Sequence, residues 1–301
     1  MGRKLHMKVF KTETARRKVY ETYDQLLILW GVELKEVDID TKYGSTHIIV
    51  CGNDNNPPLV LFHGVGDNSA LMWILNAKEL AKHFHIYAVD TIGGPGKSRP
   101  NENYNKNFSQ ILWVDEVFMK LNIEKANIAG VSNGSYITHH YGIERPEKVI
   151  KMVCMAGSVS TIGDPHPIKT MLKVFLPEAL IPTKKNMSKL IQKLSGDHSS
   201  VLTDNAVIMQ HYTYLLRGFN NMSMAYHKIE FFNDNQISNL CGKCLFLCGE
   251  ADPLGDVTKT KEKFEKYQLE YQFYKGVGHG INHEISDEIN QKIIDYMTET
   301  S

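Results

Sequence analysis

The sequence predicts an α/β fold in which a mostly parallel sheet of eight strands carries helices on both faces. The first observation is an alternation of short apolar runs with stretches of helical periodicity over residues 58–155, which demands parallel strands. The second is that runs such as 58–62 are continuously apolar, as strands buried on both faces require. The third is a segment, 158–236, that contains helical patterns only. A length of 301 residues then fits one large domain with an inserted helical segment.

The N-terminal part precedes the parallel units. Apolar and aromatic side chains recur at helical spacing over residues 14–30, which predicts a helix packed across the sheet edge. Residues 37–39 and 46–50 alternate as strands do, and Lys42-Tyr43-Gly44 lies between them. We therefore expect an antiparallel hairpin with Gly44 at its tip.

The parallel units follow in chain order, each strand leading into a helix. After the sixth strand the helical insert separates the last two strands from the rest, and an amphipathic helix running to about residue 297 closes the chain. We expect strands at 59–62, 86–89, 127–129, 149–155, 243–248 and 270–274, and helices at 70–83, 108–121 and 133–143.

The strand at 127–129 leads into Gly130-Val131-Ser132-Asn133-Gly134, the G-x-S-x-G pattern of a nucleophile elbow. Such a turn holds the serine in strained backbone geometry with its hydroxyl exposed. Gly130 and Gly134 are needed because a Cβ at either position would collide with the neighbouring strand or helix. The pattern predicts that Ser132 is the nucleophile of an acyl transfer, the alternative being an ordinary turn serine.

A glycine-rich turn, His63-Gly64-Val65-Gly66, follows the first parallel strand. Such a turn leaves backbone N–H groups free, and these donors stabilise the oxyanion in acyl transfer. We expect the donors to be the N–H groups of Val65 and Asn133, the latter directly after the nucleophile. His63 is interpreted as structural, since its imidazole can tie this loop to its neighbours. His63 and Trp73 are also candidates for the pocket wall, although a buried role is equally open for Trp73.

The two strands after the insert each end in a candidate catalytic residue. Asp252 follows the strand at 243–248, and His279 lies in a glycine-flanked turn after the strand at 270–274. His279 is the candidate base and Asp252 the candidate acid, with Glu250 or Asp256 of the same loop as competing acids. The chain order is serine, acid, histidine, and each lies past the C-terminal end of a strand, where ligands bind in open α/β sheets.

These motifs resemble those of the α/β-hydrolase superfamily over nearly the whole chain. Within it the sequence is similar to bacterial carboxylesterases that cleave arylpropionate esters such as naproxen esters. The loop 90–98 is one residue longer than the D-x-x-G-x-G-x-S of many α/β-hydrolases, and these esterases share the longer loop. The resemblance implies the α/β-hydrolase fold, and the glycine spacing of the family's acid turn favours Asp252. The matching stretches are Tyr23-Asp24 through Leu29-Trp30, Thr46-His47, Pro57 through Gly64, Ala88 through Gly93, and Pro146 through Val149.

The insert at 158–236 is expected to be a cap over the active site, so the core comprises residues 1–157 and 237–301. The cap is rich in methionine and aromatic side chains, which often line an adaptable apolar pocket but also simply hold helices on a core. The residues concerned are Met209, Tyr212, Tyr214, Met222, Met224, Tyr226, Phe231 and Phe232.

Together these features predict a serine carboxylic-ester hydrolase that acts through an acyl-enzyme on small to medium apolar esters. A serine at the elbow argues against haloalkane dehalogenases and epoxide hydrolases, which use aspartate there. It does not separate esters from thioesters, lactones or the carbon–carbon bonds split by related hydrolases. A ligand-binding protein that turns over its signal slowly on the same fold is the alternative from another class.

Composition and charge limit the classes of partner that we expect for this protein. The formal net charge is zero with dispersed Lys and Arg, which indicates neither nucleic acid nor an anionic membrane surface as a partner. No apolar run approaches the roughly 20 residues of a membrane span, and no apolar core follows the basic N-terminus, so we expect a cytoplasmic enzyme. No cofactor or metal is expected, because His139 and His140 lack partners at metal-ligand spacing. Cys241 and Cys244 are interpreted as buried thiols rather than a redox pair, and a homodimer is left open.

Overall fold

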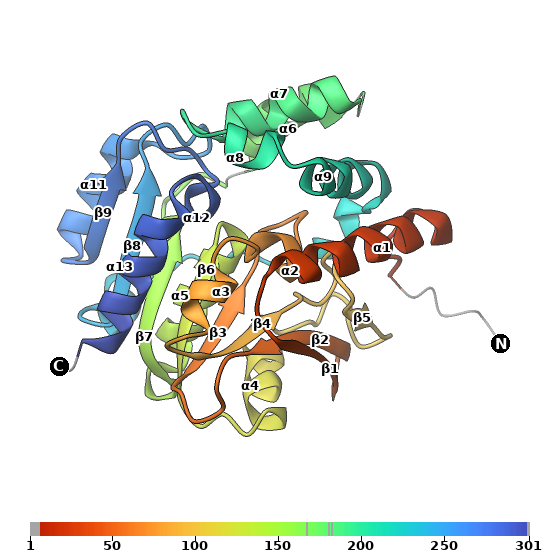
Figure 1. Ribbon diagram of the computed structural model, residues 1–301. Helices are drawn as coiled ribbons and strands as arrows, with labels where there is room; N and C mark the ends of the chain where they lie inside the picture. The colour runs from red at the N-terminus through yellow and green to blue at the C-terminus, as the bar shows by residue number, and fades with distance from the viewer. Residues whose placement is uncertain (1–6, 167, 180, 182, 300–301) are drawn as a thin grey trace.

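A single sheet organises the residues that the computed structural model describes, which are 7–166, 168–179, 181 and 183–299 (Figure 1). Its strands are β1 (Leu34–Thr41), β2 (Gly44–Cys51), β3 (Pro58–Phe62), β4 (His85–Val89), β5 (Arg99–Pro100), β6 (Ala126–Val131), β7 (Val149–Met155), β8 (Cys244–Gly249) and β9 (Glu270–Tyr274). The order is β1-β2-β4-β3-β6-β7-β8-β9, and the two-residue β5 pairs with β2 beside this path. The neighbouring strands along β4-β3-β6-β7-β8-β9 all pair in parallel. β2 runs antiparallel to its three neighbours β1, β4 and β5. The predicted mostly parallel sheet is confirmed, and β5 is too short to show a period in the sequence.

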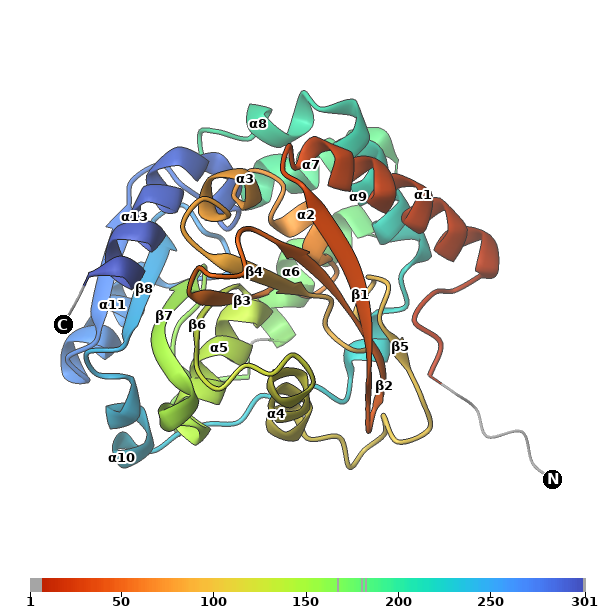
Figure 2. The same ribbon diagram turned by 60° about the horizontal axis from the view of Figure 1, so that its bottom comes forward.

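Helices cover both faces of the sheet (Figure 2). One apolar core contains side chains of α1 (Glu13–Leu29), α2 (Ser69–Met72), α3 (Ala77–Leu80) and α13 (Ser286–Thr298). A second core contains side chains of α4 (Gln110–Lys120), α5 (Asn133–Glu144) and α11 (Val257–Lys266). Along β3, Leu59 and Leu61 join the first core whereas Val60 and Phe62 join the second, as alternation along a strand requires. The continuous apolar run therefore reflects burial on both faces.

The single helix predicted at 70–83 is wrong, because the segment forms α2 and α3 with a turn between them. Trp73 directly follows α2, and Asn76 directly precedes α3. The Asn76 side-chain N–H₂ group donates to the Asn290 side-chain oxygen (2.8 Å) and to the Asn282 carbonyl (3.0 Å). These bonds hold the turn against the C-terminal segment of the chain, and apolar periodicity carries no information about them.

The N-terminal hairpin forms, but its tip differs from the prediction. Thr41 pairs with Gly44, so the loop is Lys42-Tyr43 and Gly44 opens β2. Gly44 has a φ of 130°, and a Cβ there would collide with the Arg99 carbonyl of β5. The close approach of β5, rather than the turn itself, requires glycine at this position.

Cys241 also departs from expectation, because it is exposed whereas Cys244 is buried in β8. Cys241 lies in the turn that precedes β8, which begins at Cys244. The expectation of two buried thiols is therefore wrong for Cys241. The Cys244 Sγ lies 3.6 Å from the Sγ of Cys154 on the neighbouring strand β7, and both thiols are free.

The chain between β7 and β8 is mostly helical. Its helices α6 to α9 lie over one end of the sheet (Figure 1), whereas α10 packs beside the C-terminal part of α5 (Figure 2). Its helices include α6 (Ile168–Ala179), α7 (Lys184–Leu194), α8 (Ser200–Thr203), α9 (Ala206–Gly218) and α10 (Asp234–Ile237). A bridge between Thr161 and Phe232 brings the two ends of this segment together. The division into core and cap at 158 and 236 stays a prediction, and residues 1–6, 167, 180, 182, 300 and 301 of those ranges lie outside the described residues.

His211 joins the helical segment to the core. α9 lies beside α1 (Figure 1), and the His211 Nδ1 is 2.6 Å from the Thr22 Oγ1 of α1. The Asn68 side-chain N–H₂ group lies 2.9 Å from the His211 Nε2, which accepts its hydrogen bond, so the Nδ1 carries the proton. Burial lowers the pKa of His211 to about 3, which keeps the imidazole neutral. This one side chain thus fixes α9 against α1 and against the loop before α2.

Candidate active site

Ser132 is the single residue between β6 and α5, so strand and helix meet at a tight turn. Its φ of 57° and ψ of −115° are unusual for a residue with a Cβ, and such strain costs about 1–3 kcal/mol. The Ser132 N–H donates to the Met155 carbonyl of β7 (2.9 Å), which holds the turn against the sheet. A Cβ at Gly130 would collide with the Gly134 carbonyl, and one at Gly134 with the Phe62 carbonyl. The two glycines therefore allow α5 to start directly above the strand.

His279 and Asp252 contact each other across two loops. The His279 Nδ1 lies 2.7 Å from the Asp252 Oδ2, and the Asp252 Oδ1 accepts the Leu254 N–H at 2.8 Å. Among the competing acids, Asp256 caps α11 by accepting a backbone N–H of that helix (3.1 Å), and Glu250 is exposed. Asp252 is therefore the acid of this loop that faces the histidine.

The electrostatics of this pair suit a general base. Burial of His279 opposes the imidazolium, but the charge and hydrogen bond of Asp252 outweigh that effect, so the pKa of His279 is raised. Because the Asp252 carboxylate accepts from Nδ1–H, the neutral imidazole keeps a lone pair on Nε2. That lone pair is the proton acceptor that a serine nucleophile requires.

Ser132, Asp252 and His279 follow β6, β8 and β9, which are parallel members of one block of strands with β7. The carboxyl ends of parallel strands meet at one edge of a sheet, so the three residues lie at the same edge. The helical segment reaches this edge, since the His279 N–H donates to the Leu194 carbonyl at the end of α7 (2.6 Å).

Glu284, at the end of α12 (Ile281–Glu284), holds the histidine loop from another side. Its carboxylate accepts the N–H of Gly278 (3.1 Å) and the N–H of Gly196, which follows α7 (2.7 Å). Burial raises the pKa of Glu284, although these N–H groups favour its charged form. No sequence motif indicates this role, because the partners are backbone groups that only folding brings together.

The loop after β3 lies beside the nucleophile, because a Cβ on Gly64 would be 3.4 Å from the Ser132 Cβ. The Thr91 N–H donates to the His63 Nε2 (2.9 Å), so the His63 Nδ1 carries a proton and donates to the Gly64 carbonyl (2.8 Å). Burial lowers the pKa of His63 and favours this neutral form. His63 thus ties the loop to the one after β4, which is the structural role that the sequence predicts for it.

Residues Gly64 to Asp67 form a tight turn closed by a hydrogen bond from the Asp67 N–H to the Gly64 carbonyl (3.4 Å). Gly66 has a φ of 76°, a conformation that favours glycine at the third position of such a turn. Asn133 is the first residue of α5, so its N–H has no acceptor within the helix. The predicted oxyanion donors, the N–H groups of Val65 and Asn133, thus belong to segments that flank the nucleophile.

The buried side chain of Asp90 holds the loop 90–98 in place. The buried Asp90 carboxylate accepts the N–H groups of Ser69 (2.9 Å) and Lys97 (2.7 Å) and the Tyr23 hydroxyl (3.0 Å). The longer loop is therefore joined to α1 and to the start of α2, on the side of the sheet where the helical segment lies.

Trp73 and His63 are both fully buried. The Trp73 indole N–H has no hydrogen-bond partner among the described residues. That they line the substrate pocket stays a prediction.

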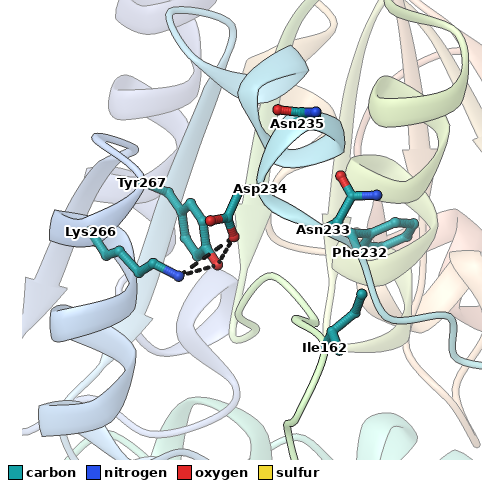
Figure 3. A pocket seen from close by; sticks show the side chains of 7 residues that line it. All are labelled: Ile162, Phe232, Asn233, Asp234, Asn235, Lys266 and Tyr267. Carbon is teal, nitrogen blue, oxygen red and sulfur yellow. Dashed lines mark hydrogen bonds and ion pairs between the residues drawn. The ribbon is translucent and has the colours of Figure 1, made fainter.

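A separate cavity of about 350 Å³ lies between the start of α10 and the end of α11 (Figure 3). There the Tyr267 hydroxyl donates to the Asp234 carboxylate (2.8 Å), and the Lys266 ammonium lies 3.5 Å from the same carboxylate. The residues that line this cavity are Ile162, Phe232, Asn233, Asp234, Asn235, Lys266 and Tyr267. None of them belongs to the site around Ser132.

His139 and His140 are buried in α5 among aromatic rings such as those of Tyr136 and Phe232. Within residues 7–166, 168–179, 181 and 183–299, no group of three His, Cys, Asp or Glu side chains could hold a metal ion. Over the same ranges, no helix has the length and apolar character needed to span a bilayer.

A strained serine between strand and helix, with an Asp–His pair at the same edge of a mostly parallel sheet, defines the α/β-hydrolase class of proteins. The chain belongs to this family, because the family model described as alpha/beta hydrolase fold matches residues 57–284.

Two curated relatives are carboxylesterases of Bacillus subtilis (strain 168). The uncharacterized carboxylesterase nap is 37% identical over 132 residues, which cover 44% of this chain and 44% of the relative. Carboxylesterase YbfK is 32% identical over 180 residues, which cover 60% of this chain and 58% of the relative. The chain thus spans about half the length of the curated relatives it matches.

A solved structure shows the same fold over nearly the whole chain. The crystal structure of naproxen esterase (carboxylesterase NP) from Bacillus subtilis has a TM-score of 0.81 at 24% identity, covering 96% of this chain and 100% of that chain. The resemblance to naproxen-type carboxylesterases is therefore confirmed, and the chain is carboxylesterase-like in sequence and in fold.

Proposed function

We propose that this chain is a serine carboxylic-ester hydrolase that uses Ser132, His279 and Asp252. The observation that carries the proposal is the 2.7 Å contact between the His279 Nδ1 and the Asp252 Oδ2, at the sheet edge where a strained turn holds Ser132. An imidazole oriented by a carboxylate, next to a serine held clear of its strand, is what acyl transfer to serine requires. The curated carboxylesterases among the relatives support esters as the substrate class.

The mechanism has two acyl-transfer steps. His279 takes the Ser132 proton at Nε2 while the serine Oγ attacks the ester carbonyl, and the N–H groups of Val65 and Asn133 bind the resulting oxyanion. Asp252 stabilises the imidazolium, which then gives the proton to the leaving alcohol. Water attacks the acyl-enzyme by the same path, which releases the carboxylic acid and restores Ser132.

The proposed substrates are small to medium apolar esters. Met209 and Tyr212 of α9 are half-buried and pack against the apolar core, whereas the basic side chains of Lys169, Lys173 and Arg217 are exposed. Because these three cations face water, they offer no buried partner to a negatively charged acyl group, whose desolvation is costly. Apolar acyl groups instead gain from burial.

We expect the rate to rise and then fall along a series of p-nitrophenyl acetate, butyrate, hexanoate and octanoate. Each buried methylene contributes about 0.8 kcal/mol until the acyl chain outgrows the space beneath the cap. Steady-state kcat/KM measures this profile, and succinate half-esters should be poor substrates. A preference for the succinate would contradict the apolar pocket and would mean that a basic side chain of the cap points inward.

The reaction class is tested by running the ester series beside thioesters, lactones and carbon–carbon ring-cleavage products. Rapid steady turnover of esters, together with labelling by a fluorophosphonate, is the expected result. Faster turnover of another substrate class would replace the ester assignment while keeping the nucleophile. A stoichiometric burst with no further turnover would instead indicate a ligand-binding protein on the same fold.

A further inference from the structure

The turn that follows β3 carries a buried carboxyl group that the proposed mechanism does not use. Asp67 closes the Gly64–Asp67 turn and is only 7% exposed. Its Oδ1 accepts the Asn68 N–H at 2.7 Å, and the Tyr212 hydroxyl of α9 donates to the carboxylate. A buried acid thus lies in the turn that carries the proposed oxyanion donor Val65, and it contacts α9 of the cap.

The surroundings of Asp67 disfavour its negative charge. Around it lie Tyr212 of α9, Asp90 after β4, and the neutral His211, which contacts the neighbouring Asn68. Burial is the main cause that raises the pKa of the Asp67 carboxyl to about 7, and the charge of Asp90 adds to it. The Asn68 N–H and the Tyr212 hydroxyl act in the opposite direction and only partly offset this rise.

We propose that Asp67 controls the oxyanion hole through its ionisation, so that the protonated carboxyl permits catalysis and the carboxylate opposes it. The inference rests on the proposed function. Asp67 is a positioning residue rather than a catalytic one, because its charge acts on the oxyanion from a distance, through the loop that carries the Val65 N–H. The bond from the Tyr212 hydroxyl helps to set the pH at which Asp67 ionises.

The geometry places the Asp67 charge close enough to matter. A turn of this type brings its first and fourth Cα atoms within about 7 Å, and Val65, the proposed donor, is the second residue of the turn. The reaction creates a negative oxygen at that donor. Two like charges roughly 8 Å apart in a partly buried site repel strongly enough to slow the reaction on the order of tenfold.

The expected pH dependence follows from the signs of two ionisations. His279 must be neutral to accept the Ser132 proton, so kcat/KM rises as the pH rises through the His279 pKa. The carboxylate form of Asp67 slows the reaction on the order of tenfold, so kcat/KM falls towards a lower plateau as the pH rises through about 7. The wild type should therefore show a descending limb above neutral pH that the triad alone does not produce.

Three variants test this origin with p-nitrophenyl butyrate between about pH 5 and 9, read at the isosbestic wavelength of the released nitrophenol. Asp67→Asn should abolish the descending limb and leave a plateau. Tyr212→Phe removes a bond that lowers the Asp67 pKa, so the limb should move to higher pH. Tyr214→Phe is the matched control, because its hydroxyl contacts Gln210 of the same helix, and its profile should match the wild type.

A second measurement locates the Asp67 ionisation without using activity. Its pKa rises from 3.8 to about 7 on folding, so its contribution to stability is present at low pH and is lost as the pH rises towards 7. The difference in thermal midpoint between Asp67→Asn and the wild type should therefore move in favour of the variant from about pH 5 to 8.

Two outcomes would overturn the inference while leaving the esterase proposal intact. One is an active wild type without a descending limb, and the other is a limb that persists unchanged in Asp67→Asn. A wild type that hydrolyses no ester and takes no fluorophosphonate label would instead refute the proposed function, and the inference would fall with it.

Discussion

Replacing Ser132 by alanine should lower kcat for ester hydrolysis by about 10⁶-fold, the loss seen when the serine of a serine protease triad is removed. The variant should still fold, because serine and alanine meet the same backbone strain at a φ of 57°. Steady-state turnover of p-nitrophenyl butyrate and labelling by a fluorophosphonate measure the loss, and circular dichroism verifies the fold.

The matched control is Ser135→Ala in α5, the helix that follows Ser132. The Ser135 hydroxyl is buried against the Cys154 thiol and has no bond to Asp252 or His279, so its removal should change kcat by no more than a few fold. If Ser132→Ala retained a tenth of wild-type turnover, with contaminating esterases excluded, Ser132 would not be the nucleophile.

Replacing Asp252 by asparagine should lower kcat by about 10⁴-fold, because an amide cannot stabilise the imidazolium and favours the wrong tautomer of His279. In the wild type the Asp252 carboxylate lies 2.7 Å from the His279 Nδ1, and its charge raises the pKa of the imidazole. The ascending limb of the rate profile of Asp252→Asn should therefore move to lower pH. Steady-state kinetics over a pH series measures both effects.

Two neighbouring acids supply the controls for Asp252. Asp256→Asn should stay close to wild type, since asparagine caps a helix as well as aspartate does. Glu250→Gln alters an exposed side chain and should also have little effect. A loss of 10⁴-fold in either control, with Asp252→Asn active, would move the role of the acid to that residue.

Features that depend on local chain geometry could be predicted from the sequence. A turn as tight as the one at Ser132 admits only glycine at fixed offsets, so Gly130 and Gly134 mark it without any tertiary information. The sequence favoured Asp252 as the acid but left Glu250 and Asp256 as competitors, because all three acids lie in one loop. The direction of each side chain, which the fold determines, separates them.

Contacts between distant segments could not be predicted in this way. Asn76 interrupts a helical pattern because its amide binds the C-terminal segment, and Glu284 binds backbone groups of two other loops. The contact between Asp67 and Tyr212 joins a turn to α9 of the helical segment. None of these partners has a fixed separation in sequence, so no periodicity or motif marks them.

The insertion of the helical segment between two strands that pair side by side has a consequence for folding and for change during evolution. β7 and β8 pair in parallel although the whole segment from Met155 to Cys244 separates them. The entropy lost on closing such a loop grows only with the logarithm of its length, so doubling the loop costs about 0.6 kcal/mol. Helices can therefore be lengthened, shortened or replaced there with little penalty to strand pairing. The insert can therefore diverge in sequence and length while the strands that Ser132, Asp252 and His279 follow stay unchanged.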